Sequence, residues 1–215
     1  MPGPSEHWLL DGPVGPMEVL ADLPASPAGL ALVAHPHPLF GGANTNKVTY
    51  TLAHALRDLG YVALRPNFRG VGKSGGTHDL GVGETDDLLW LLGEARRRFD
   101  PEGRLPVALA GFSFGAYVQT RVAKRLEQAQ TPAKRMVFVG IAAGLLEGTR
   151  LYEPEAIAPD SLLIHGDRDT IVPLANALAF ATPLQIPVVV IPGADHFFHG
   201  RLPLLRNIIT RAWRD

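Results

Sequence analysis

A serine with a glycine two residues away on each side lies near the middle of the chain, in residues 111–115. A serine hydroxyl becomes a useful nucleophile when a histidine accepts its proton and a carboxylate orients that histidine. In a G-x-S-x-G turn, the chain passes so sharply from strand to helix that glycine, which lacks a Cβ, is needed on both sides. Ser113 is therefore a candidate nucleophile.

The flanks of this turn have the patterns of the two elements that it needs. Residues 107–110 form a short, continuous apolar run, as expected for a strand covered on both faces. From residue 116 to residue 128, apolar and polar side chains recur with helical spacing. These patterns predict a buried strand that leads into Ser113 and a helix that follows it.

The rest of the chain alternates between predicted strands and predicted helices. Strands are expected at residues 29–34, 61–65, 136–141, 161–165 and 187–191, and helices at 44–59, 84–98, 173–181 and 202–213. This alternation predicts an α/β fold with a mostly parallel central sheet and helices on both faces. The proline- and glycine-rich residues 1–28 predict an irregular lead-in and edge strands, including one at 17–23. A length of 215 residues favours a single domain over residues 1–215.

Two later strand ends offer a histidine and an acid. Functional groups in open α/β sheets gather beyond the carboxyl ends of the strands. Asp167 and Asp169 lie in the loop after one predicted strand, and His196 and His199 lie in the loop after another. Asp167 could instead form a loop hydrogen bond, and His199 could be a helix-start or surface residue. These patterns leave both pairs open.

Five motifs, together with their order, resemble the α/β-hydrolase superfamily. They are HPHPLFGG followed by an asparagine-lysine pair, NFRGVGKSGG, GFSFGA, HGDRDTIVP and GADHFFHG. More narrowly, they are similar to small lidless hydrolases related to dienelactone hydrolase. This resemblance implies Ser113 as nucleophile, Asp169 as acid and His196 as base. The nucleophile of dienelactone hydrolase is cysteine, so a lactone substrate is not implied here.

The oxyanion of an acyl-transfer reaction needs backbone N–H donors. One comes from the residue after the nucleophile, here Phe114 at a helix N-terminus. The second is expected in the loop after residues 29–34, where Pro36 and Pro38 have no N–H. This leaves His37, Leu39, Phe40 and the glycines of that loop. The resemblance favours Leu39.

The segment at residues 142–160 is too short for a cap domain, so we expect an open site formed by loops. The side chains expected to line it are Leu39, Phe40, Phe112, Phe114, Phe197 and Phe198. Phe40 and Phe197 are the candidates for the substrate pocket, whereas Phe112 and Phe198 could equally fill the core.

Composition and motifs argue against several other classes of function. The formal net charge is −1, which gives no electrostatic case for nucleic acid or an anionic membrane as partner, and the chain has no cysteine. Residues 70–75 fit G-x-G-x-x-G but lead into a loop, so nucleotide binding is not favoured. His35 and His37 lack a convincing third metal ligand. We therefore expect no cofactor and no metal.

These observations predict a serine hydrolase that cleaves a small carboxylic ester or thioester through an acyl-enzyme intermediate. Amidase, peptidase or lactonase activity on the same triad remains an alternative, as does a non-catalytic binding protein with this fold. No signal peptide or membrane span is evident, which favours a cytoplasmic protein. We expect a small-molecule substrate as the partner, and a monomer or a homodimer.

Overall fold

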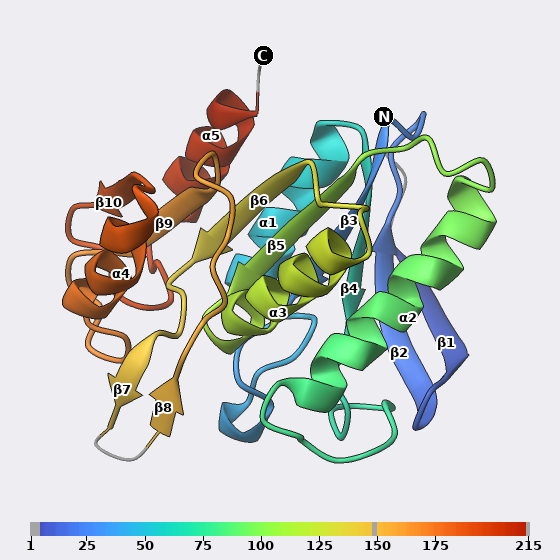
Figure 1. Cartoon of the computed structure of the whole chain (residues 1–215), viewed down its shortest axis with the longest axis horizontal. Coiled ribbons are helices and arrows are strands. Elements are labelled where there is room, and N and C mark those ends of the chain that lie inside the picture. Colours follow the sequence, from blue (N-terminus) through green and yellow to red (C-terminus); the bar gives the residue numbers. More distant parts are fainter. Residues whose placement is uncertain (1–4, 148–149, 214–215) are drawn as a thin grey trace.

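The apolar runs of the sequence form the strands of a central sheet. A computed structural model describes residues 5–147 and 150–213 (Figure 1). The strands of the main sheet are β1 Glu6–Gly12, β2 Gly15–Asp22, β3 Gly29–Ala34, β4 Tyr61–Pro66, β5 Val107–Phe112, β6 Arg135–Val139, β9 Leu162–Gly166 and β10 Val188–Ile191.

Over the described residues, these strands form one sheet in the order β1-β2-β4-β3-β5-β6-β9-β10. The strands from β4 to β10 pair in parallel with their neighbours. Strands β1 and β2 form an antiparallel hairpin, and β2 pairs antiparallel with β4. The predicted mostly parallel sheet is therefore confirmed.

Helices cover both faces of this sheet. They are α1 Lys47–Asp58, α2 Val82–Phe99, α3 Phe114–Gln128, α4 Leu174–Ala181 and α5 Leu202–Ala212. In Figure 1, α2 and α3 lie in front of the sheet and α1 lies behind it. The two sides have separate cores, because residues of α2, α3 and α4 belong to one apolar cluster and those of α1 and α5 to the other. The predicted α/β architecture is thus confirmed.

Strand β3 shows why the central strands have continuous apolar sequences. Leu30 and Leu32 pack into the core under α2 and α3, whereas Ala31 and Val33 pack into the core under α1 and α5. Successive side chains of a strand point to opposite faces, so a strand covered on both faces has no polar positions. The same double coverage applies to β5, which is buried along its length and ends at Ser113.

The edge hairpin and the start of α1 show how the observed bounds differ from the sequence prediction. Among residues 5–28, β1 and β2 form a complete hairpin, in keeping with the predicted edge strands, but the bounds of β1 were not predicted because its side chains are exposed or half-exposed. Residues 1–4 of the predicted lead-in lie outside the described residues. Helix α1 begins at Lys47 instead of residue 44, because the Asn46 side chain accepts hydrogen bonds from the Val48 and Thr49 N–H groups.

The segment between β6 and β9 contains a small hairpin that the sequence patterns do not reveal. Strand β7 Gly144–Leu146 pairs antiparallel with β8 Arg150–Tyr152, apart from the main sheet. In Figure 1 this hairpin projects below α4, whose Asn176 side chain donates to the Ala143 carbonyl at 2.8 Å. Three residues are too few for a strand period to be recognised. The described part of residues 142–160 forms no cap domain, as predicted.

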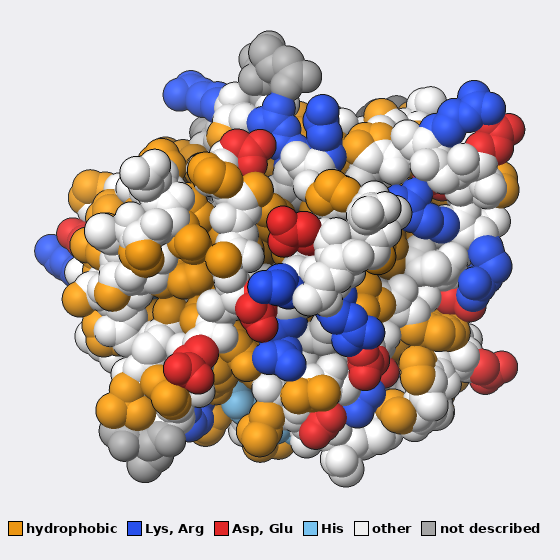
Figure 2. Space-filling view, in the orientation of Figure 1, with side chains coloured by type: hydrophobic (Ala, Val, Ile, Leu, Met, Phe, Trp, Pro, Cys, Tyr) orange, Lys and Arg blue, Asp and Glu red, His pale blue; other side chains and the backbone are white. Residues whose placement is uncertain are grey.

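The surface carries charges of both signs. Figure 2 shows lysine and arginine side chains interspersed with aspartate and glutamate on the face that it presents, in keeping with the net charge of −1. Within the described residues, the helices are all too short or too polar to cross a membrane.

A buried ion pair joins the edge hairpin to the loop that follows β3. Arg65 donates from Nε and Nη2 to the Asp22 carboxylate at 2.7 and 3.1 Å, and from Nη1 to the Asn44 carbonyl at 2.9 Å. Arg65 is only 2% exposed and Asp22 is fully buried. Removing one charge of such a pair leaves the other buried without compensation.

We therefore expect Asp22→Ala to lower the free energy of unfolding by about 3–5 kcal/mol, measured by urea denaturation. The matched control is Asp86→Ala, which removes one partner of an exposed pair with Arg125 and should cost less than about 1 kcal/mol. Equal small losses for both variants would contradict this role of Asp22.

Candidate active site

Ser113 occupies a strained turn between β5 and α3. Its backbone has φ 55° and ψ −119°, which side-chain-bearing residues rarely adopt. The Ser113 N–H donates to the Val139 carbonyl at 2.9 Å, and its carbonyl accepts from the N–H groups of Ala116 and Ala142 at 3.0 and 3.2 Å. These bonds to α3 and to the β6 end hold the turn in place.

The two glycines of the motif are required by close backbone contacts. A Cβ on Gly111 would lie 2.6 Å from the backbone nitrogen of Ala116. A Cβ on Gly115 would lie closer than 3.0 Å to the carbonyl oxygens of Ala34 and His35, at the end of β3. Helix α3 thus starts directly against the end of β3, and only glycine leaves room for this close approach.

Asp169 and His196 come from the loops after β9 and β10 and contact each other. Asp169 Oδ2 lies 2.6 Å from His196 Nδ1, and its Oδ1 accepts the N–H groups of Ile171 and Val172 at 2.9 and 2.8 Å. Both side chains are buried. An ionised carboxylate only accepts, so Nδ1 carries the proton and Nε2 is left as an acceptor.

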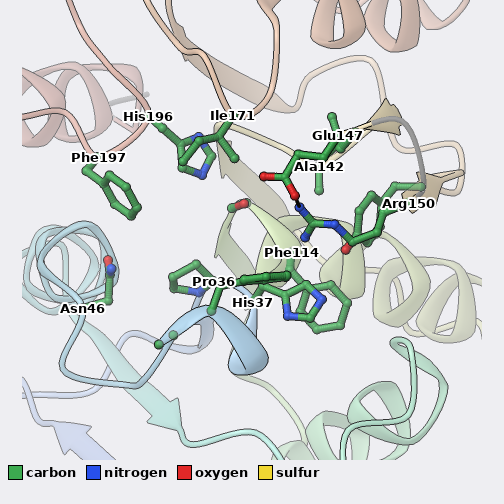
Figure 3. A pocket seen from close by; sticks show the side chains of 16 residues that line it. Pro36, His37, Asn46, Phe114, Ala142, Glu147, Arg150, Ile171, His196 and Phe197 are labelled. Atoms are coloured by element: carbon green, nitrogen blue, oxygen red, sulfur yellow. Dashed lines mark hydrogen bonds and ion pairs between the residues drawn. The ribbon is translucent and has the colours of Figure 1, made fainter.

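Ser113 and His196 line the same pocket, which has a volume of about 280 Å³ (Figure 3). Among the described residues, the Ser113 hydroxyl forms no hydrogen bond with His196. Catalytic hydrogen bonds are often long before substrate binds and tighten in the substrate complex. The arrangement brings the three residues favoured by the resemblance into one site.

The two alternatives from the sequence lie elsewhere. Asp167 Oδ1 accepts the Gly193 N–H at 2.6 Å, a loop hydrogen bond of the kind considered above. His199 pairs with Asp195 at 2.6 Å, and both side chains are exposed. Neither lines the pocket. Asp169 and His196 are therefore the pair that the fold assembles beside Ser113.

His165, the first residue of the HGDRDTIVP motif, lies at the end of β9 and is a neighbour of this pair. Its Nε2 lies 2.9 Å from the Val172 carbonyl and 3.4 Å from Asp169 Oδ2. Burial lowers the pKa of His165, and the nearby Val172 carbonyl and Asp169 charge oppose this shift. The neutral ring supports the loop that carries Asp169.

Some backbone N–H groups at this site already donate hydrogen bonds within the protein, and others do not. The Phe114 N–H lies in the first turn of α3, where helix N–H groups have no partner within the helix. In the loop after β3, the Leu39 N–H donates to His37 Nδ1 at 3.2 Å, and the Phe40 and Gly42 N–H groups donate to the His37 carbonyl at 3.1 and 3.0 Å. Within the described residues, the His37 N–H has no acceptor, and His37 lines the pocket.

The apolar walls of the pocket agree only partly with the expected set. Phe40, Phe114 and Phe197 line it. Phe112 and Phe198 are fully buried core residues, and Leu39 is 68% exposed and outside the pocket lining. The sequence analysis did not predict that the β7–β8 hairpin forms one side of the pocket. The hairpin residues that line it are Leu146, Glu147, Arg150 and Tyr152.

His35 and His37 are both held as neutral rings. Burial lowers the pKa of His35 to about 4, and its ring nitrogens bond the Pro36 carbonyl and the Phe68 N–H. Burial, together with the nearby His78 and Arg150, lowers the pKa of His37 to about 4. Over the residues described, no group of three or more histidine, aspartate or glutamate side chains is placed to hold a metal ion.

The glycine-rich loop at residues 70–76 packs against β2 and does not open a helix. The Gly75 N–H donates to the Pro16 carbonyl at 2.7 Å, and the Lys73 N–H donates to the Glu18 carboxylate at 2.9 Å. A carboxylate at this position opposes binding of a phosphate group.

The fold and the arrangement of these residues define an α/β hydrolase. Residues 99–199 match the family described as serine hydrolase (FSH1). The chain is 38% identical to an alpha-beta serine hydrolase homologue from Coxiella burnetii, over 99% of both chains with a TM-score of 0.83. It is 37% identical to XC6422 from Xanthomonas campestris, an α/β serine hydrolase without lid, over 99% of this chain and 94% of that one, also with a TM-score of 0.83.

An uncharacterised protein of Rickettsia prowazekii, RP471, is 36% identical over 203 residues, which cover 87% of this chain and 80% of the relative. The similarity to the two solved structures covers 99% of this chain and so extends through the elements that carry the candidate site. This chain belongs to the α/β serine hydrolase family.

The contact of Gly115 with β3 can be tested by adding one methyl group. Gly115→Ala should lower the free energy of unfolding by about 1–3 kcal/mol, because the Cβ would overlap two carbonyl oxygens. Gly93→Ala is the control, since a Cβ on this α2 residue meets only an ordinary contact and should stabilise the helix by up to about 1 kcal/mol. Thermal unfolding measures the stability of both variants. A Gly115→Ala variant that is as stable as the wild type would contradict the contact.

Proposed function

We propose that this protein hydrolyses a small carboxylic ester or thioester through an acyl-enzyme intermediate on Ser113. The observation that carries the proposal is the buried Asp169–His196 pair, joined at 2.6 Å, beside a serine in a strained turn at the same pocket. A neutral imidazole with a free Nε2 is the base that a serine hydroxyl requires.

In the proposed reaction, His196 Nε2 accepts the hydroxyl proton as Ser113 Oγ forms a bond to the carbonyl carbon. The tetrahedral intermediate collapses, the bond to the alcohol or thiol breaks, and His196 returns the proton to that leaving group. Water then repeats the sequence on the acyl-enzyme and releases the acid and Ser113. Asp169 stabilises the imidazolium in both halves and keeps its own charge.

The oxyanion is proposed to be held by two backbone N–H groups. Phe114 provides one. For the second, the resemblance favours Leu39, but its N–H is engaged by the His37 ring, whereas the His37 N–H has no acceptor among the described residues. We therefore propose His37 as the second donor. Pro36 and Pro38 restrict the backbone on both sides of it, which suits a preorganised donor.

Ser113→Ala should lower kcat for a short p-nitrophenyl ester by at least about 10³-fold, because the variant lacks the hydroxyl that is proposed to form the acyl-enzyme. Ser26→Ala, at an exposed loop position, should keep full activity. Release of p-nitrophenol measures both. A Ser113→Ala variant with wild-type kcat would refute the assignment of the nucleophile.

Asp169→Asn should lower kcat by about 10³- to 10⁴-fold, because an amide can hold His196 in the wrong tautomer. Asp167→Asn is the matched control on the same loop, and it should change kcat by only a few-fold. The opposite ranking of these two variants in steady-state kinetics would assign the acid to Asp167.

A further inference from the structure

The β7–β8 hairpin places a charged pair inside the pocket. Arg150 and Glu147 project into it from the side opposite Phe197 and His196 (Figure 3). Apart from the histidines, these are the charged side chains among the described pocket residues. The remaining lining is largely apolar or backbone. A positively charged side chain in such a pocket suggests a role in binding a negatively charged group.

Arg150 is held against an apolar wall. Its guanidinium carbon lies 4.3 Å from the centre of the Phe40 ring, over the ring face, and its side chain is only 24% exposed. Tyr152, two residues after Arg150 on β8, is buried, which raises the pKa of its hydroxyl, and the Arg150 charge opposes that shift. These contacts fix the guanidinium at the pocket wall.

Glu147 is a weak partner for this guanidinium. Its carboxylate meets Arg150 through Nη2 alone, at 2.6 Å, and its side chain is 61% exposed. Its backbone has φ 49°, a conformation that side-chain-bearing residues rarely adopt. Ion pairs with such an exposed partner contribute little to stability. The guanidinium group has five N–H donors in a fork that fits a carboxylate. A ligand carboxylate can therefore replace Glu147 at low cost.

We propose that Arg150 is a specificity-determining residue that binds a carboxylate carried by the substrate, and that Glu147 occupies this place when substrate is absent. The inference rests on the proposed function and narrows its substrate class to esters or thioesters with a second, free carboxylate on one side of the scissile bond. The scissile carbonyl lies at Ser113 and the free carboxylate lies at the hairpin wall.

Two matched pairs of substrates test this proposal. p-Nitrophenyl hydrogen adipate and p-nitrophenyl methyl adipate differ by a carboxylate on the acyl side. 4-(Butyryloxy)benzoate and its methyl ester differ by a carboxylate on the leaving-group side. Rates are corrected with the Ser113→Ala variant, and the readout is the ratio of kcat/KM for the anionic over the neutral member of each pair.

In at least one pair, Arg150→Gln should lower this ratio by about 10- to 100-fold, mainly through KM, as expected for loss of a charged hydrogen bond. Glu147→Gln should raise the same ratio by a few-fold, and Arg150→Lys, which keeps the charge without the fork, should give an intermediate value. Arg125→Gln removes a positive charge outside the pocket and should leave the ratio unchanged.

A purely structural role in the hairpin predicts that Arg150→Gln and Glu147→Gln lower both members of each pair together, with the ratio unchanged, and this result would overturn the proposal. It would leave the proposed function intact if the neutral esters are still cleaved in a Ser113-dependent way. Absence of Ser113-dependent cleavage of all four esters would overturn the proposed function and, with it, the role of Arg150.

Discussion

The close approach of α3 to the end of β3 is the constraint on which the site depends. Because Gly115 lies against the Ala34 and His35 carbonyls, the chain must turn at Ser113 within a single residue, in a left-handed conformation. The cost of this conformation is of order 1–3 kcal/mol and is offset by the hydrogen bonds that fix Ser113 to β6 and to α3. The serine is thereby directed to the edge of the sheet where the other functional loops end.

The parallel sheet then brings the partners to Ser113. Strands β3, β5, β9 and β10 all end at the same edge, so the loops that carry His37, Asp169 and His196 converge there. Two of these loops are held in place by buried polar groups. Arg65 holds the Asn44 carbonyl after β3, and His165 contacts the Val172 carbonyl in the Asp169 loop. Rigid loops of this kind suit chemistry that needs preorganised donors.

The sequence predicted the elements whose burial leaves a continuous pattern. Strands β3 and β5 are covered on both faces and read as apolar runs, and α3 keeps a clear helical period. It gave no bounds for β1, which lies at the sheet edge, and it missed the three-residue strands β7 and β8, whose side chains alternate over too short a distance. The candidate site divides in the same way. Ser113 was proposed from its motif, and Asp169 and His196 from the resemblance to α/β hydrolases. The His37 N–H, which has no acceptor among the described residues, and the position of Arg150 in the pocket depend on tertiary contacts that no local pattern encodes.

The central claim is that Ser113 is a nucleophile activated by His196. The most direct measurement is mass spectrometry of the folded protein after treatment with a fluorophosphonate, followed by peptide mapping. We predict a single adduct on Ser113 that forms at least about 10²-fold more slowly when His196 is replaced by alanine. An adduct on another residue, or a folded protein that does not react, would contradict the claim.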